Sequence, residues 1–369
     1  MVASSTTPAD RRRLPVVGSR SAVYETLPPR PEGWGVEGPP PLVDGRGRRY
    51  GYLRLSVTDR CDLACVYCMP PGGEDDHAVR RDLLTFEEAA RLVGVFAAMG
   101  AERVRFTGGE PLVRKDVVRL VELVRRRTGL EQLVMTTNAT RLGELARPLA
   151  EAGLSGVNVS LDTLDAVRFR EVTRGGDLKR VLAGIHGALD AGLEVKLNVV
   201  PLRGVNDDEL GRIVDFCWAH GITPRFIELM PLGEGAKLDA AMRITADDVV
   251  ATLGERVAPG VRQGVPGRGP ARYLQARDGS GRRVGLITAV SDEFCESCNR
   301  VRVTARGDIR TCLAARRAVS LRDVMRAGGS DADVAWAVHW SLAGKDAGHA
   351  FLDEDVREHE HVGMSLIGG

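Results

Sequence analysis

Short apolar stretches alternate with longer amphipathic segments from about residue 50 onward. Each short stretch has the length and β-branched content of a strand, and the segment after it spaces its apolar residues as a helix does. This alternation predicts consecutive β/α units around a parallel sheet. The expected strands are 51–57, 103–106, 133–135, 156–159, 194–200 and 225–229.

Polar or glycine-rich residues gather at the carboxyl ends of these predicted strands. The second strand runs into residues 108–111 (Gly-Gly-Glu-Pro), and other strands end near Thr136, Ser160 and Met230. In β/α barrels the active site is built from the loops at this end. We therefore expect one shared cavity, although ordinary turn chemistry would explain Thr136 or Ser160 taken singly.

The two ends of the chain differ in composition from the middle. Residues 1–42 are rich in Ser, Thr, Arg and Pro with few apolar residues, which predicts a flexible leader. Residues 43–260 carry the β/α alternation. After a Gly-, Pro- and Arg-rich stretch, 273–276 and 283–287 alternate like paired strands in a second unit, 261–369. The predicted fold is α/β, an incomplete (β/α)6-type barrel with a smaller C-terminal α+β domain.

Charge and cysteine usage narrow the function classes. Lys and Arg number 51 against 50 Asp and Glu, a formal net charge of +1, which does not favour a nucleic acid or an anionic membrane as partner. No apolar run reaches the roughly 18 residues of a membrane span, and no signal peptide is recognisable. Six of the seven Cys stand in two close triads and Cys217 stands alone. This spacing is typical of metal binding, and it predicts a protein of the reducing cytoplasm.

The first triad, Cys61, Cys65 and Cys68, has the spacing C-x3-C-x2-C with Tyr67 before the last thiol. An iron–sulfur cube has four irons, so three thiolates leave one iron open to a small molecule. Structural zinc usually takes four ligands, and His77 is the nearest additional candidate. We therefore favour a [4Fe–4S] cluster over a zinc knuckle or chance clustering.

The second triad, Cys295, Cys298 and Cys312, again supplies three thiols and favours a second cube, with a zinc site completed by a distant His as the alternative. Arg300 and Arg302 alternate on an extended segment, so both side chains point the same way and suit a triphosphate. Taken alone, two solvent-facing arginines would be the better explanation.

Lys196 lies inside an apolar predicted strand, where an unpaired ammonium would be costly. Lysine is otherwise scarce in this chain. We therefore expect an anion close to Lys196.

The two triads, the Gly-Gly-Glu-Pro loop, the arginine pair and the terminal Gly368-Gly369 together resemble the GTP 3',8-cyclases, molybdenum-cofactor biosynthesis enzymes of the radical S-adenosylmethionine (radical SAM) superfamily. The resemblance runs from about residue 43 to the end. It implies a radical SAM barrel and a second iron–sulfur cluster in the C-terminal domain. One departure is Asn138-Ala139, where the family commonly has Asn-Gly, which leaves the turn after the third strand open.

The resemblance also implies roles for individual residues. It implies that Cys61, Cys65 and Cys68 hold the first [4Fe–4S] cluster and Cys295, Cys298 and Cys312 the second; that Tyr67, Gly109, Ser160 and Met230 contact SAM; that Arg54, Arg105, Thr136, Lys196, Arg300, Val301 and Arg302 contact GTP; and that Arg300, Arg302, Gly368 and Gly369 take part in catalysis.

The implied reaction is a lyase reaction. SAM is cleaved to methionine and a 5'-deoxyadenosyl radical, which takes hydrogen from C3' of GTP, and the C3' radical adds to C8 to give (8S)-3',8-cyclo-7,8-dihydroguanosine 5'-triphosphate. The implied partners are GTP, a reducing electron donor and cyclic pyranopterin monophosphate synthase as the recipient of the product, with a homodimer left open.

Two alternatives stay open at this stage. One is a radical SAM peptide maturase with one auxiliary cluster, although such enzymes usually carry more C-terminal Cys. The other is a metal-binding nucleic-acid module, which the near-neutral charge disfavours.

Overall fold

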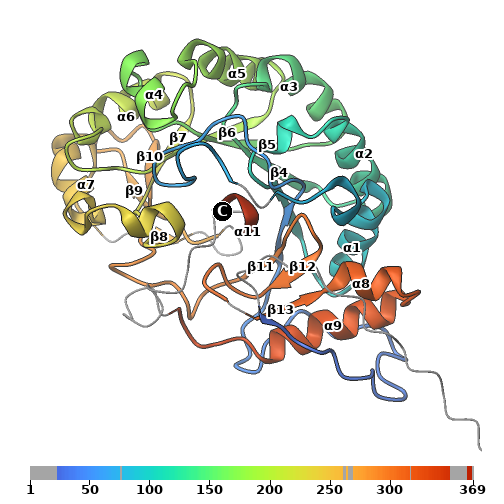
Figure 1. Cartoon of the computed structure of the whole chain (residues 1–369). Helices are drawn as coiled ribbons and strands as arrows, with labels where there is room; N and C mark the ends of the chain where they lie inside the picture. Colours follow the sequence, from blue (N-terminus) through green and yellow to red (C-terminus); the bar gives the residue numbers. More distant parts are fainter. Residues whose placement is uncertain are drawn as a thin grey trace, which may run out of the picture.

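The computed structural model describes residues 23–74, 77–260, 263–264, 269–315, 317–349 and 364–367. In this part of the chain a 13-stranded sheet curls into an open barrel whose helices pack outside it (Figure 1). The strands are β1 (Val23–Tyr24), β2 (Tyr52–Ser56), β3 (Arg103–Thr107), β4 (Gln132–Thr137), β5 (Gly156–Ser160), β6 (Glu194–Val199), β7 (Thr223–Ile227), β8 (Gln263–Gly264), β9 (Arg272–Gln275), β10 (Arg283–Ile287), β11 (Arg300–Val303), β12 (Asp308–Arg310) and β13 (Arg317–Ser320).

Helices follow the barrel strands and cover the outer face of the sheet. The α-helices are α1 (Phe86–Ala98), α2 (Val117–Thr128), α3 (Leu142–Glu151), α4 (Ala166–Val172), α5 (Leu178–Asp190), α6 (Leu210–Ala219), α7 (Ala246–Leu253), α8 (Leu321–Arg326), α9 (Asp331–Ala343) and α11 (Met364–Ile367). Short 3-10 turns are η1 (Arg80–Asp82), η2 (Pro111–Val113), η3 (Asp207–Glu209), η4 (Gly233–Lys237), η5 (Ala240–Met242) and η6 (Gly254–Arg256). None of these helices is long and apolar enough to cross a membrane.

Strands β2 to β7 are the six predicted strands, and they pair in parallel in chain order. Apolar residues of these strands, such as Leu53 and Phe106, are fully buried. The first outer helix begins where the sequence indicates, because Thr85 and Glu88 form a capping box that satisfies free N–H groups of its first turn. The predicted α/β barrel of consecutive β/α units is thus confirmed.

The C-terminal unit continues the same sheet at both of its edges. Strand β11 pairs in parallel with β2, and β10 pairs in parallel with β7. The predicted hairpin is present as antiparallel β9 and β10. The smaller C-terminal unit is therefore built onto the barrel sheet, because its strands extend that sheet at both edges.

Residues 23–42 belong to the folded unit, so the predicted flexible leader is wrong for this segment. Strand β1 pairs with β13, and Trp34 packs edge-on against Trp336 of α9 with ring centroids 5.3 Å apart. Arg30 also forms an ion pair with Asp333 at 2.8 Å. A few aromatic and apolar side chains outweigh the Pro-rich composition, because each aromatic ring buries a large area. Residues 1–22 lie outside the described part.

Candidate active site

The first triad follows β2 at the carboxyl ends of the barrel strands, whereas Cys298 precedes β11, which runs parallel to β2, and so lies at their amino ends. All six cysteines of the two triads line one cavity of about 310 Å³. This volume lies within the range of small-molecule sites in proteins. The predicted convergence of the strand ends is therefore present in the fold. The predicted SAM-contact residues Tyr67, Gly109, Ser160 and Met230 line the same cavity.

The loop of the first triad follows β2 and is held from behind by the end of α4. The backbone N–H groups of Ala64 and Val66 donate to the carbonyls of Thr173 and Val172 at 3.2 and 2.9 Å. The Arg174 guanidinium donates to the carbonyls of Ala64 and Met69. Arg174 has a φ of 52°, a left-handed conformation that costs a side-chain-bearing residue energy. Sequence reasoning missed this residue, because no motif includes it.

Burial dominates the electrostatics of the first triad. It raises the pKa of the Cys61 and Cys68 thiols to about 12, and nearby carboxylates add to the effect. Thiolates are the metal-binding form, so cluster loading must release protons from these groups.

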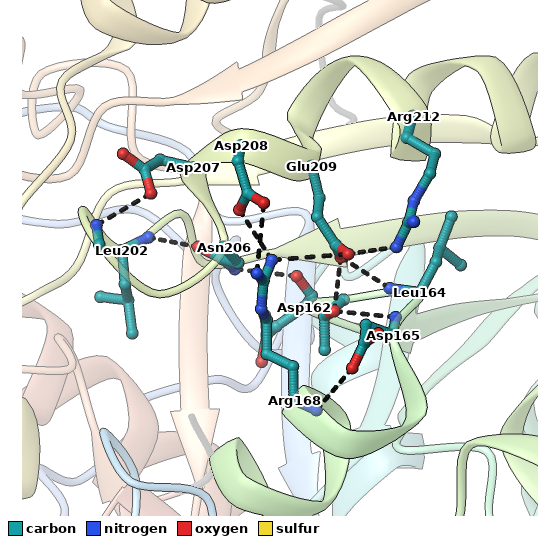
Figure 2. A network of polar contacts seen from close by, with 12 residues as sticks. Asp162, Leu164, Asp165, Arg168, Leu202, Asn206, Asp207, Asp208, Glu209 and Arg212 are labelled. Atoms are coloured by element: carbon teal, nitrogen blue, oxygen red, sulfur yellow. Dashed lines mark hydrogen bonds and ion pairs between the residues drawn. The ribbon is translucent and has the colours of Figure 1, made fainter.

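Tyr67 is fixed by a buried carboxylate at the end of β5. Its hydroxyl donates to Asp162 at 2.6 Å, and Asp162 also accepts the backbone N–H of Val200 at 2.8 Å. Burial raises the pKa of Asp162 to about 6. Figure 2 shows Asp162 joined to Asn206, whose amide donates to the Asp162 carbonyl at 2.8 Å, and the neighbouring contacts of Glu209 extend the network outward. The phenol thus has one defined position in the cavity.

The Gly-Gly-Glu-Pro loop brings backbone against backbone. A Cβ at Gly108 or Gly109 would lie 2.3 Å from a carbonyl oxygen of Thr58 or Arg60, so only glycine fits there. Glu110 then accepts hydrogen bonds from Leu112, Thr137 and Asn138, which ties this loop to the end of β4.

The turn after β4 keeps its left-handed geometry without glycine. Ala139 has a φ of 62° and is fully buried. The departure from the common Asn-Gly pattern therefore changes the residue and not the turn, at a cost of about 1 to 2 kcal/mol for a left-handed alanine.

Three arginines form a row across adjacent strands. Arg302 of β11 stands opposite Arg54 of β2, which stands opposite Arg105 of β3. Burial lowers the pKa of Arg54 and brings that of Arg302 down to about 10, and the neighbouring guanidinium groups add to both effects. Like charges on neighbouring strands repel one another. The row, with Thr136 3.3 Å from Arg105, lines the cavity beside Arg300 and suits a polyanion.

Lys196 and Val301 do not line this cavity. Val301 is fully buried in β11, so its side chain packs in the core. Lys196 lines a small neighbouring pocket, and its ammonium lies 2.6 Å from Glu194. That carboxylate supplies the anion expected near Lys196.

Arg225 lines both this pocket and the main cavity, together with Arg105. The sequence analysis missed Arg225. It could have been found by the signal that identified Lys196, because it is also a cation within an apolar strand.

The chain returns to the cavity near its end. Helix α11 lies inside the barrel (Figure 1), where Met364 and Ser365 line the cavity. Ile367 packs against Leu232 and Leu313. The predicted catalytic residues Gly368 and Gly369 lie outside the described residues.

Two cations contact the second triad. The Cys298 sulfur lies 3.8 Å from an Arg300 nitrogen and 3.7 Å from the Lys345 ammonium. Burial raises the pKa of this thiol, but the two cations outweigh it and lower the pKa to about 7. The cysteine is therefore prepared to act as a thiolate ligand.

Among the described residues, one group of possible zinc ligands includes a cysteine of the second triad. Glu293, Cys295 and His349 place their ligand atoms within 4.8 Å of one another. Cys298 and Cys312 are not part of this set, so it would use one thiol of the triad and leave two over. A zinc ion there does not account for the three-cysteine pattern.

Comparison with known proteins divides the chain into two matched parts. Residues 55–217 match the Radical SAM superfamily, and residues 222–351 match the family described as Molybdenum Cofactor Synthesis C. The chain is 44% identical over 332 residues to GTP 3',8-cyclase of Heliobacterium modesticaldum, covering 89% of this chain and 100% of the relative. The chain belongs to the GTP 3',8-cyclase family. GTP 3',8-cyclase 1 of Pseudomonas aeruginosa is 43% identical over 312 residues, covering 84% of this chain and 94% of the relative.

Solved structures share the fold of this GTP 3',8-cyclase family member at low identity. Streptococcus suis SuiB bound to precursor peptide SuiA aligns with a TM-score of 0.51 and 15% identity, over 84% of this chain and 64% of SuiB. The protein anSMEcpe with bound AdoMet aligns with a TM-score of 0.51 and 14% identity, over 81% and 79% of the two chains.

The residues present fit the two [4Fe–4S] clusters of a GTP 3',8-cyclase. Each triad brings three thiols to the same cavity, so each could hold three of the four irons of a cube. Cations at Cys298 compensate thiolate charge at the second site. The alternative of a peptide maturase is not favoured.

Proposed function

We propose that this protein converts GTP to (8S)-3',8-cyclo-7,8-dihydroguanosine 5'-triphosphate, the first step of molybdenum cofactor biosynthesis. This proposal is supported by one observation, namely that two three-cysteine sites and a row of arginines line the same cavity. When bound, the first cluster supplies the electron that cleaves SAM to methionine and a 5'-deoxyadenosyl radical.

The test is isotopic. Anaerobically reconstituted protein with SAM, a reductant and GTP deuterated at C3' should transfer deuterium into 5'-deoxyadenosine and form the cyclised nucleotide. Product without deuterium transfer would refute hydrogen abstraction at C3'. A reaction with peptide but not with GTP would favour the maturase alternative.

The protein's own residues orient the reactants and exclude water. Asp162 fixes the hydroxyl of Tyr67, and Gly109 lines the cavity without a side chain. Together they define one binding position for SAM beside the first triad. Leu63 and Met364 contribute apolar walls to the cavity. Holding the C3' hydrogen close to the radical makes the step effectively intramolecular, and an apolar wall removes competing hydrogen donors.

We place the GTP triphosphate along Arg302, Arg54 and Arg105, with its end toward the pocket of Lys196. Lys196 then contributes less than an arginine of the row, because Glu194 already compensates its charge. Lys196→Met should weaken GTP binding by about 1.5 kcal/mol, roughly tenfold, with SAM binding unchanged.

This contact should also depend on pH. Burial lowers the pKa of Lys196 to about 8 against the opposing effect of Glu194. The ammonium is therefore mostly charged at pH 7 and mostly neutral at pH 9, so GTP affinity should fall over this interval. Isothermal titration of Lys196→Met should show a smaller fall than the unchanged protein, with the exposed Lys237→Met as control. Equal pH dependence in all three would remove Lys196 from the GTP site.

We propose that Gly368 and Gly369 act in the cavity, since α11 brings the chain there. Double glycine can pass through a gap that a side chain would block. Removing both residues should leave iron content and fold intact but uncouple the reaction, so that 5'-deoxyadenosine forms slowly without cyclised nucleotide. Chromatography of both products measures this, and full-rate cyclisation by the shortened chain would contradict it.

We also propose a cytoplasmic setting, a reducing electron donor and transfer of the product to cyclic pyranopterin monophosphate synthase. Six of the seven cysteines stand in the two triads, a spacing typical of metal binding, which supports a reducing compartment. Homodimer formation stays a prediction from the family resemblance.

A further inference from the structure

The segment after α9 places Lys345 next to the second cysteine triad. Lys345, only 8% exposed, donates from its ammonium to the Thr311 carbonyl at 2.5 Å and lies 3.7 Å from the Cys298 sulfur. Thr311 precedes Cys312, so one ammonium contacts the chain at two of the three cysteines. Arg48 contacts the third cysteine, because its guanidinium donates to the carbonyls of Cys295 and Ala347 at 2.9 and 2.7 Å.

The surroundings hold Lys345 in a single place. Its ammonium lies 4.5 Å from the centre of the Tyr50 ring, in a cation–π contact. The Tyr50 hydroxyl donates to Asp44 at 2.7 Å, and Asp44 pairs with Arg48 at 2.6 Å. Asp44 is thus already neutralised by Arg48. Burying an ammonium is costly unless an anion compensates it, and the Cys298 sulfur, which is a thiolate when it ligates a metal, lies in contact with it.

The two triads differ in the donors that reach their sulfurs. Cys61 accepts hydrogen bonds from the Leu63 backbone at 3.5 Å and from the Asn138 amide at 3.8 Å, which are neutral donors. Cys298 is contacted by two cations, Arg300 and Lys345. The reduction potential of an iron–sulfur cluster depends on nearby charge and on hydrogen bonds to its sulfurs.

We propose that Lys345 is a positioning residue of the second cluster, whose buried ammonium holds the Cys298 thiolate and raises the reduction potential of that cluster. This inference rests on the proposed function, since it requires a cluster at the second triad. A fixed positive charge stabilises the reduced cluster, which carries the extra electron, more than the oxidised one. Loss of the charge therefore makes reduction harder.

The experiment compares Lys345→Met and Lys345→Arg with the unchanged holoenzyme, using Lys179→Met as the control. Lys179 is exposed on α5 and outside both cavities. Iron and sulfide per chain are counted, and both clusters are titrated by electron paramagnetic resonance. We expect Lys345→Met to shift the potential of the second cluster to more negative values, while the first cluster stays unchanged and Lys345→Arg and Lys179→Met match the unchanged protein.

A fully loaded Lys345→Met protein with an unchanged second potential would overturn the proposal. If Lys345→Met loses the second cluster, retention in Lys345→Arg supports a requirement for charge, and equal loss in both variants refutes it. Failure of the proposed function is a separate result, because the unchanged protein would then lack sulfide or would not cyclise GTP.

Discussion

Replacing Cys61, Cys65 and Cys68 with Ala should halve the bound iron and abolish SAM cleavage. The unchanged protein should hold roughly eight irons per chain, because each triad supports one four-iron cube. The loop containing these thiols also lines the cavity beside Tyr67, so loss of the first cluster would remove the iron that we propose binds SAM. Iron and sulfide analysis with a 5'-deoxyadenosine assay measures both effects.

The remaining cysteines provide two controls for this result. Cys217→Ala should keep all the iron, because Cys217 is buried in the core within α6 and does not line the cavity. Replacing Cys295, Cys298 and Cys312 should also halve the iron, but some SAM cleavage should persist without cyclised product. Stoichiometric zinc without sulfide in the unchanged protein would contradict the assignment of both triads.

Arg302→Met should weaken GTP binding ten- to a hundredfold, or about 1.5 to 3 kcal/mol, and leave SAM binding nearly unchanged. Arg302 is almost fully buried at the cavity wall, where a charge-assisted contact to phosphate is poorly screened by water. The substitution also relieves repulsion with Arg54, which should offset part of the stability lost with the other contacts of Arg302. Binding is measured by equilibrium dialysis and stability by thermal melting.

A matched arginine separates this effect from a general loss of positive charge. Arg180 is exposed on α5, and Arg180→Met should leave GTP affinity unchanged. Unchanged GTP affinity in Arg302→Met would instead remove the arginine row from the substrate site.

The barrel could be predicted from the sequence because its signals are local. Each strand has its own apolar run and polar end, and Thr85 marks a helix start without reference to any distant residue. The pairing of β11 with β2 could not be predicted in this way, since it joins segments far apart in the chain. The same limit explains the error at Trp34, whose partner Trp336 stands at the other end of the sequence.

The residues of the candidate site could likewise be predicted only where their signal is local in the sequence. Both cysteine triads have diagnostic spacing, so the sequence was enough to place them. Arg174 and Lys345 reach the cysteine loops from separate segments as single cations, and only the folded chain brings them there. Lys196 was recognised as needing an anion, but the sequence alone could not distinguish a bound phosphate from the neighbouring Glu194.

The pairing of β2 with β11 fixes the spacing between the two reaction sites. Strand β2 leads directly into the loop of Cys61, and β11 begins at Arg300, two residues after Cys298. Backbone hydrogen bonds with Arg300 opposite Tyr52 hold these two strands in one register. The two cysteine triads thus lie at opposite ends of one pair of strands, and separating them would require breaking this strand pair within the sheet. The distance between the two triads is then set by the sheet itself.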